Sequence, residues 1–322
     1  MNDSIKVSVL IPIYKVENFL EKMLDTVFTQ TYSNLYYVFV NDNSPDMSLE
    51  ILKRAIKKYG IDSDRYTIIT HKENEGVAKS RKDCIENAKG DYIYFVDADD
   101  WIDNDAIEKM VDATKGGLVD IIGCDYIDEL GNDNSLYHHE NYADTCYENM
   151  VRCINYDVSP VLWKLLIRKQ LFKCFSITSG IDIGEDYAIT IKLFYYARSF
   201  VALNKAFYHY VHGNQLKLSY QRRRSLYDHI EIVKEVEKFL EDKKVLDEEV
   251  KNKLNLRKFN IKSNFLVKQT WDSRAYREVF PNVNTLWRFL NYGKKEKIKF
   301  WLAEKKLFFL LKIYRIIWNS RL

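Results

Sequence analysis

The first hundred residues alternate short, apolar, β-branched segments with amphipathic segments at helical spacing. The apolar segments predict buried strands, and the amphipathic segments predict helices between them. Strands joined by helices require right-handed crossovers, which give a mainly parallel sheet covered by helices on both faces. The sequence therefore predicts an α/β fold. The expected strands are Val7–Pro12, Tyr36–Val40, Tyr66–Ile69 and Tyr92–Val96, and the expected helices are 17–30, 49–56 and Val77–Ala88.

Three of these strands run directly into polar or conformationally special segments: Pro12–Tyr14, Asn41–Asp46 and Asp97–Asp100. In open α/β sheets, ligands bind beyond the carboxyl ends of the strands. We therefore expect the three segments to lie along one edge of the sheet and to form a single ligand site.

The later part of the chain is less regular. The pattern predicts a fifth strand at Asp120–Asp125, a polar loop at Asp128–Asn141, and helices at Leu162–Leu171 and Tyr187–Ala197. Beyond about residue 222 the chain is expected to be helical. We therefore expect a ligand-binding domain over residues 1–220, followed by a helical C-terminal extension over residues 221–322.

Composition excludes several classes of protein. The net charge of +3 is too small to indicate a nucleic-acid partner. The five cysteines have no C-x-x-C spacing, which is typical of buried thiols in a reducing compartment. The N-terminus lacks a signal peptide pattern, and no stretch reaches the ~18 apolar residues of a membrane span. These features predict a cytoplasmic protein.

Charge is concentrated near the C-terminus, where ten lysines and arginines after residue 285 face only two glutamates. In the segment 296–318, apolar residues alternate with basic ones, and Trp301 and Trp318 suit an interface. This pattern predicts an amphipathic helix that lies on an anionic membrane, so the protein would be peripheral at the inner face of the cell membrane. The alternative is a terminal helix packed on the catalytic domain.

The acidic run Asp97-Ala98-Asp99-Asp100 places three carboxylates in four residues at a strand end. These carboxylates repel one another unless a cation neutralises them. Mg²⁺ and Mn²⁺ bind carboxylate oxygens together with substrate phosphates, so the run predicts a metal ion on a pyrophosphate. The alternative is an ordinary acidic strand end without a metal.

Asp42 follows the second strand, where its carboxylate is placed to accept a hydrogen bond from a base N–H or a ribose. Its alternative is an N-cap of the next helix, a role that suits Asp46 or Ser48 better.

The other candidates for the nucleotide site lie near the same strand ends. Pro12 and Tyr14 follow the first strand, and Tyr14 is placed to stack on a base. Glu17 either holds the base or ribose or begins a helix. Arg81 either reaches the pyrophosphate or is a solvated arginine on its helix.

Together these segments resemble the family 2 inverting glycosyltransferases, whose nucleotide-binding domain has the Rossmann-like GT-A fold. The resemblance covers residues 1–220, although Lys15 stands where Asn is usual and Asn43 where Gly is common. The matching segments are Val7–Tyr14, Val40–Asp46, Asn74–Arg81, Gly90–Asp100, Val161–Ile167 and Gly184–Asp186.

The resemblance implies the binding roles within the acidic run and at Asp42. Asp42 would bind the base, Asp97 the ribose and Asp99 the metal, with Ala98 also in the nucleotide-sugar site. The implied cofactor is Mn²⁺ or Mg²⁺. Asp100 has no assigned role beyond support or helix capping.

The resemblance also implies that Asp186 is the general base, with Glu185 as its rival. An inverting transfer needs one carboxylate to deprotonate the acceptor hydroxyl, and the metal stabilises the leaving diphosphate. Without the resemblance, Glu185 and Asp186 would be an acidic pair at a helix N-terminus.

Three further residues have weaker assignments. Trp163 and Lys164 either shape the acceptor site or belong to the core. His212 either approaches the diphosphate or metal or is structural. The predicted reaction transfers a sugar from a nucleotide-diphosphate sugar, expected to be a UDP-sugar, to a glycan or lipid-linked glycan in bacterial surface polysaccharide synthesis. The alternatives are a nucleotidyltransferase and a non-catalytic, membrane-associated nucleotide-binding module.

Overall fold

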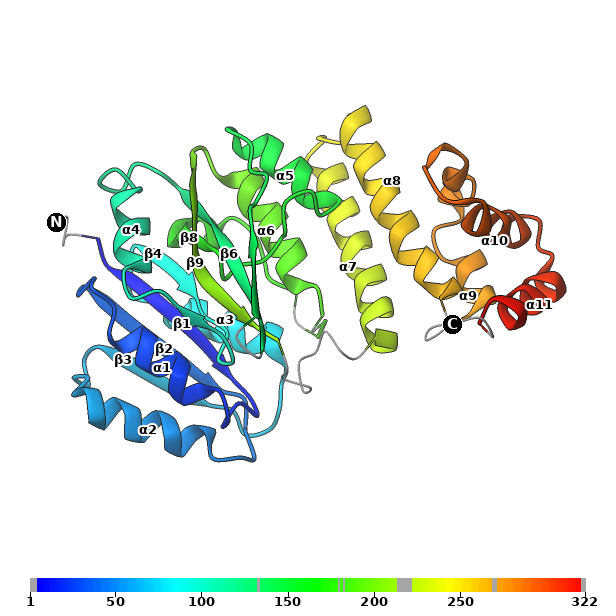
Figure 1. Ribbon diagram of the computed structural model, residues 1–322. Helices are drawn as coiled ribbons and strands as arrows, with labels where there is room; N and C mark the ends of the chain where they lie inside the picture. The colour runs from blue at the N-terminus through cyan, green and yellow to red at the C-terminus, as the bar shows by residue number, and fades with distance from the viewer. Residues whose placement is uncertain are drawn as a thin grey trace. The chain divides into compact units, whose positions relative to one another are not determined.

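The computed structural model describes residues 5–131, 134–178, 180–181, 183–212, 222–267 and 271–319. By its internal contacts the chain divides into two compact units, residues 1–217 and 218–322. The first unit is an α/β unit and the second consists of helices (Figure 1).

The N-terminal half of the first unit is a parallel sheet in the order β3-β2-β1-β4. Its helices follow the strands in alternation, as the sequence predicts. The strands are β1 (Val7–Ile13), β2 (Leu35–Asn41), β3 (Tyr66–Thr70) and β4 (Tyr92–Phe95). The helices are α1 (Leu20–Phe28), α2 (Ser48–Tyr59) and α3 (Val77–Asn87). All four predicted strands and all three predicted helices are confirmed.

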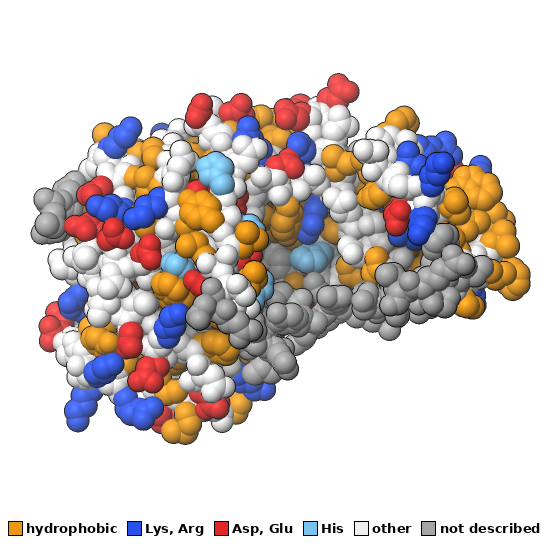
Figure 2. Space-filling model, viewed as in Figure 1, with side chains coloured by type: hydrophobic (Ala, Val, Ile, Leu, Met, Phe, Trp, Pro, Cys, Tyr) orange, Lys and Arg blue, Asp and Glu red, His pale blue; other side chains and the backbone are white. Residues whose placement is uncertain are grey.

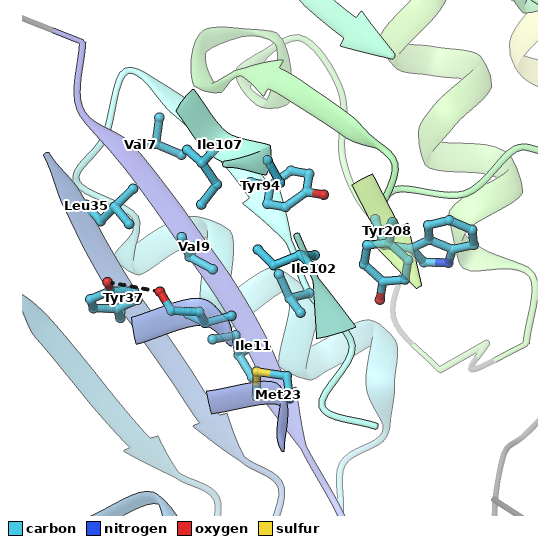
Figure 3. Packing of buried hydrophobic residues seen from close by; sticks show 14 of the residues in the cluster. Val7, Val9, Ile11, Met23, Leu35, Tyr37, Tyr94, Ile102, Ile107 and Tyr208 are labelled. Carbon is cyan, nitrogen blue, oxygen red and sulfur yellow. Dashed lines mark hydrogen bonds between the residues drawn. The ribbon is translucent and has the colours of Figure 1, made fainter. Parts of the chain in front are cut away.

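Helices cover both faces of this sheet. On one face, alternate residues of β1 such as Val9 and Ile11 pack with Met23 of α1, since successive strand side chains point to opposite faces (Figure 3). On the other face, Cys84 of α3 approaches the carbonyl oxygen of Val38 at 3.8 Å. The expected covering of both faces is therefore confirmed.

The C-terminal half of the sheet is mixed. β8 (Leu165–Arg168) lies between β4 and β6 (Ile121–Gly131) and is antiparallel to both. β9 (Phe200–Val211) runs parallel to β6, and β5 (Trp101–Ile102) pairs antiparallel with β9. The sequence pattern predicts the start of β6 but neither β5 nor β9.

Two sequence-based predictions in this half are wrong. Residues 162–171 form no α-helix: they contain β8, followed by a 3-10 helix at Lys169–Lys173. β8 is buried on both faces, and a short, continuous apolar run does not distinguish a central strand from a buried helix. The predicted loop 128–141 is largely a hairpin, because β6 extends to Gly131 and pairs with β7 (Asn134–His138). β7 is mostly exposed, so it carries no apolar alternation.

Three more helices complete the first unit. They are α4 (Ala106–Asp112), α5 (Cys146–Ile154) and α6 (Glu185–Tyr196). The structure confirms the helix predicted at 187–197, which is α6. The sequence pattern misses α5, although Thr145 and Glu148 have the spacing of a capping box at its start and the Thr145 hydroxyl accepts a hydrogen bond from the Glu148 amide.

The second unit is helical, as predicted, but its last segment is not one helix. The helices are α7 (Arg222–Asp242), α8 (Glu248–Ser263), α9 (Ser273–Glu278), α10 (Lys294–Glu304) and α11 (Phe308–Asn319). Lys306 has φ +58°, and the Leu307 amide donates back to the Leu302 carbonyl at 2.9 Å. This left-handed cap ends α10 and splits the predicted segment 296–318 in two. Within the described ranges, no helix combines the length and hydrophobicity that a bilayer crossing requires.

A charged pair is buried beside the central strands. Lys164 is fully buried, and its Nζ lies 2.7 Å from Oε1 of Glu140, which is 6% exposed. The other carboxylate oxygen of Glu140 accepts a hydrogen bond from the Ser159 amide at 3.0 Å. Burial lowers the pKa of Lys164, and Glu140 opposes that effect. Each charge is therefore tolerated because the other is present.

Replacing one member of this pair is expected to cost more than replacing both. Lys164→Met leaves the Glu140 charge buried without its partner and should lower the free energy of unfolding by about 3–5 kcal/mol. Lys164→Met with Glu140→Gln removes both charges and keeps an acceptor for Ser159, so it should recover most of that loss. Urea denaturation of the three proteins measures the difference. Equal destabilisation in the single and double variants would contradict the interpretation.

Candidate functional site

The carboxyl ends of β1, β2 and β4 meet at one edge of the sheet. Ile13 pairs in register with Asn41, and Leu10 pairs with Phe95, so all three strands end on the same side. The three segments that follow them lie along this edge, as the strand order requires.

Arg81 is at the centre of the acidic part of this edge. Its Nη1 bonds to the carboxylates of both Glu185 and Asp186, and its Nη2 lies 3.0 Å from Oδ1 of Asp97. The arginine is only 5% exposed, so the alternative of a solvated arginine is wrong. Helix α3, the end of β4 and the first turn of α6 thus meet through one guanidinium group.

The electrostatics of this cluster favour protons on its acids. Burial raises the pKa of Glu185 and the pKa of Asp186 above the ordinary carboxyl range, and the Arg81 charge opposes the increase. Three carboxylates surround one cation, so the cluster keeps an excess of negative charge when they are ionised. A base with a raised pKa accepts a proton more readily at neutral pH.

Asp100 connects the same edge to β9. Its Oδ2 accepts a hydrogen bond from the Tyr208 hydroxyl at 2.8 Å, and its Oδ1 accepts one from the Val211 amide at 2.8 Å. The Tyr208 oxygen in turn accepts the Asp97 amide at 3.1 Å. Asp100 is 1% exposed, so it is a buried residue that stabilises the edge through these hydrogen bonds.

Asp42 lies at the other side of the edge and is 3% exposed. Its carboxylate accepts hydrogen bonds from the amides of Glu75 and Gly76 at 2.8 and 2.9 Å, immediately before α3. The Asp42 Oδ1 also lies 2.7 Å from Nδ1 of His71. It does not cap α2: the carboxylate that accepts the amide of the first residue of that helix, Ser48, at 3.2 Å belongs to Asp46.

The loops after β1 and β2 are tied to each other. Glu17 accepts a hydrogen bond from the Met47 amide at 2.9 Å, and the Glu17 amide donates to Asp46 at 3.1 Å. Tyr14 is 40% exposed and available for stacking, whereas Pro12 lies within β1. Asn43 adopts φ +53°, which is the left-handed geometry expected of that turn.

The predicted metal residues lie near each other in the fold, but their roles stay predictions. Asp99 is 9% exposed beside Asp97. His212 follows β9, whose Val211 is bonded to Asp100, but its Nε2 lies 3.2 Å from Asp128. Within the described residues, no group of three or more His, Cys, Asp and Glu is arranged to hold a metal ion. Mg²⁺ commonly uses one or two carboxylates plus substrate phosphates, so Asp99 and the excess negative charge fit such an ion.

Trp163 and Lys164 are both buried, and Trp163 packs against the tyrosine that supports this edge. Trp163 is 6% exposed and stacks on Tyr208 at 4.3 Å between ring centroids. Lys164 is fully buried with Glu140. These positions favour the core alternative for both residues over contact with an acceptor.

Two residues of the site were missed in the sequence. Tyr208 is interior to an unpredicted strand, so no local signal marked it. His71 directly follows β3 and would have been found if the strand-end rule had been applied to that strand as well.

Known glycosyltransferases resemble this chain in sequence. The family model for glycosyl transferase family 2 matches residues 8–181. Glycosyltransferase GlyA of Streptococcus pneumoniae is 31% identical over 216 residues, covering 64% of this chain and 30% of that protein. The putative glycosyltransferase EpsH of Bacillus subtilis is 28% identical, with 67% of this chain and 64% of the relative covered. The matched region therefore spans less than two thirds of either relative.

Solved structures share the fold. Residues 1–349 of TarS from Staphylococcus aureus, in complex with UDP-GlcNAc, superpose with a TM-score of 0.69 at 17% identity, covering 98% of this chain and 92% of that one. The family match extends over more than half of the chain, so the chain belongs to glycosyl transferase family 2. Its α/β unit has the GT-A fold and is followed by several C-terminal helices.

Removing the Tyr208 hydroxyl, which bonds to the Asp97 amide and the Asp100 carboxylate, should destabilise the protein. Tyr208→Phe leaves the buried Asp100 short of a donor, so the free energy of unfolding should fall by about 1–3 kcal/mol. Tyr59→Phe is a matched control, because its hydroxyl donates to Asp25 at 2.7 Å but the Asp25 side chain is 43% exposed. Chemical denaturation should show a change below about 0.5 kcal/mol for the control. Equal losses would contradict the supporting role of Tyr208.

Proposed function

We propose that residues 1–220 form the catalytic domain of an inverting glycosyltransferase that uses a nucleotide-diphosphate sugar, most simply a UDP-sugar. The main support for this proposal is that Asp97, Glu185 and Asp186 all bond to Arg81. Family membership sets the reaction class, and the site supplies the groups that the reaction needs.

The donor would lie along the edge formed by β1, β2 and β4. Tyr14 stacks on the base, the Asp42 carboxylate accepts its N–H, and Asp97 binds the ribose. Pro12, Glu17 and Ala98 line the same edge. A bound diphosphate would compete with the carboxylates for Arg81, so donor binding would free Asp186 from part of its ion pair.

Asp186 is the proposed general base. Its raised pKa suits the removal of a proton from an acceptor hydroxyl as that oxygen attacks the anomeric carbon. Glu185 shares the same arginine, and burial raises its pKa as well.

The proposed cofactor is Mn²⁺ or Mg²⁺, held by Asp99 and the donor phosphates. When bound, it would stabilise the negative charge on the leaving nucleoside diphosphate. A mannosyltransferase from Pyrobaculum calidifontis, with a TM-score of 0.54 at 16% identity, was solved with GDP-Man and Mn²⁺. His212 stays a weaker candidate ligand.

The acceptor is proposed to be a glycan or lipid-linked glycan of a bacterial surface polysaccharide. Matched relatives include a poly(ribitol-phosphate) β-glucosyltransferase and the minor teichoic acid biosynthesis protein GgaB. The glucosyltransferase name, together with the UDP-GlcNAc bound in the TarS structure, supports hexosyl or N-acetylhexosaminyl transfer over nucleotidyl transfer.

Binding and catalysis should separate between Asp99 and Asp186. A thermal-shift panel of UDP- and GDP-sugars should show stabilisation of the wild type that increases with Mn²⁺. Asp99→Asn should lose the Mn²⁺-dependent part, because it removes a carboxylate ligand. Asp186→Asn should keep donor binding but lower transfer or donor hydrolysis by at least about 100-fold.

Glu185→Gln is the matched control for the base. It should retain measurable turnover, because Asp186 and its bond to Arg81 remain. Absence of stabilisation by any nucleotide sugar, or full turnover in Asp186→Asn, would overturn the proposed function. Loss of turnover only in Glu185→Gln would reassign the base to Glu185.

The C-terminal helices support a proposed peripheral association with an anionic membrane. Exposed apolar side chains gather on α10 and α11 beside lysines (Figure 2). Phe309 and Ile316 are 75% and 69% exposed, whereas Leu311 is buried. The C-terminal apolar patch is defined as Trp301, Phe309, Leu310, Ile313 and Ile316. Seven lysines and two glutamates accompany it within residues 294–312, and one of these glutamates, Glu304, pairs with Arg288. An apolar surface with basic neighbours suits anionic lipid.

Phe309→Ser with Ile316→Ser should reduce co-sedimentation with vesicles of mixed phosphatidylglycerol and phosphatidylcholine by at least about tenfold, because it removes the most exposed apolar groups of the patch. The matched control is Leu118→Ser with Leu130→Ser, which removes two apolar residues that are 76% and 52% exposed in the first unit. Raised salt should weaken wild-type binding. Equal sedimentation of wild type and the patch variant would exclude this surface.

A further inference from the structure

His71 lies between two carboxylates at the end of β3. Its Nδ1 is 2.7 Å from Oδ1 of Asp42, and its Nε2 is 2.8 Å from Oδ2 of Asp83 on α3. The side chain of His71 is 5% exposed, and those of Asp42 and Asp83 are 4% and 13% exposed. Both ring nitrogens are therefore committed to buried or nearly buried acids.

This geometry determines the protonation of the ring. An ionised carboxylate only accepts hydrogen bonds, so each ring nitrogen must donate to satisfy both contacts. A neutral imidazole has one N–H and would leave a lone pair facing a carboxylate. His71 is therefore an imidazolium when both bonds are made.

The charges around the ring agree with that state. Glu75 lies 4.0 Å from Nδ1, and Lys79 pairs with Asp83 from the opposite side. Burial lowers the pKa of His71, but the bonds to Asp42 and Asp83 outweigh it and raise the pKa above the ordinary histidine value.

The imidazolium also joins separate parts of the nucleotide edge. The His71 amide donates to the Asn41 carbonyl at 3.0 Å, which extends the pairing of β2 and β3. The ring then connects the residue after β2 to helix α3, while the amides of Glu75 and Gly76 hold the same Asp42 carboxylate. Rotation of Asp42 is restricted from two directions.

We propose that His71 is a positioning residue of the donor site, which as an imidazolium fixes the Asp42 carboxylate for the nucleotide base and releases it at alkaline pH. This inference rests on the proposed function, in which Asp42 binds the base. In this proposal the neutral ring keeps its proton on Nε2, facing Asp83, and loses the bond to Asp42, so nucleotide affinity falls as pH rises through the His71 transition.

Two substitutions separate the two bonds. His71→Asn keeps an amide donor near the position of Nδ1, facing Asp42, and loses the contact with Asp83. His71→Gln keeps a donor near the position of Nε2, facing Asp83, and loses the contact with Asp42. Isothermal titration with UDP at neutral pH should give His71→Asn an affinity within about threefold of wild type. His71→Gln should be weaker by about tenfold, which corresponds to the loss of one charge-assisted hydrogen bond.

Asp83→Asn tests the pH dependence without altering the histidine. The side-chain amide that this substitution introduces satisfies Nε2 of a neutral ring, so Nδ1–H stays on Asp42 at high pH. Wild-type affinity for UDP should decline at alkaline pH relative to Asp83→Asn and His71→Asn. UDP has the same ionisation in every experiment. The ratio of wild-type to variant affinity at each pH therefore reports only the titration of the protein. Turnover at saturating donor should differ little, which places the effect in KM.

The stability of the free protein gives a second readout. The folded pKa of His71 is raised, so its stabilising contribution is complete at acidic pH and is lost as pH rises through the folded pKa. Asp83→Asn should therefore lose less thermal stability than wild type across that range. Equal UDP affinities of His71→Asn and His71→Gln, or parallel pH profiles of wild type and Asp83→Asn, would overturn the inference. If wild type binds no nucleotide at any pH, the proposed function fails, and the inference fails with it.

Discussion

One buried guanidinium organises the reactive end of this protein. Arg81 bonds to Asp97 after β4 and to Glu185 and Asp186 at the start of α6, which are more than a hundred residues away in sequence. Without that cation, three acids at low exposure would repel one another, and the end of β4 and the start of α6 would not close together. The arginine thus allows a donor-binding segment and a candidate base to share one small volume. It also ties their ionisation together, so the site behaves as a coupled unit.

The two sides of the site use different cations for the same purpose. At Arg81 the positive charge is permanent, whereas at Asp42 it is a proton on His71. A permanent charge holds the geometry at every physiological pH, and a titratable one holds it only while the ring is protonated. His209 also lies between two carboxylates, with Glu129 and Asp103 at 2.8 and 3.1 Å from its two nitrogens and Trp101 stacked on its face. The sheet edge is therefore held by charge pairing as well as by hydrophobic packing.

The parallel half of the sheet was predictable because β1 and β2 combine apolar runs with polar residues at their ends. The strand-end rule alone placed Tyr14, Asp42 and Asp97 on one edge. It would also have found His71. β8 was misread because it is buried on both faces, and β7 was missed because it is mostly exposed. The partners of Arg81 are set by a tertiary contact across the chain, which no local pattern records. Only the family resemblance predicts that Asp186 belongs to the site.

The position of β8 has a consequence for the order in which the chain can fold. β4 ends at residue 95, but the strand that covers its open side, β8, begins at residue 165. During synthesis the hydrogen-bonding groups on that side of β4 stay unpaired until about seventy more residues have been made. An uncovered strand edge pairs readily with other chains. The four parallel strands can assemble early, whereas the candidate base at the start of α6 arrives only after β8 has been made. The nascent protein therefore has most of the nucleotide edge before it has the candidate catalytic base. Its most aggregation-prone stage falls after β4 and before β8 has been made.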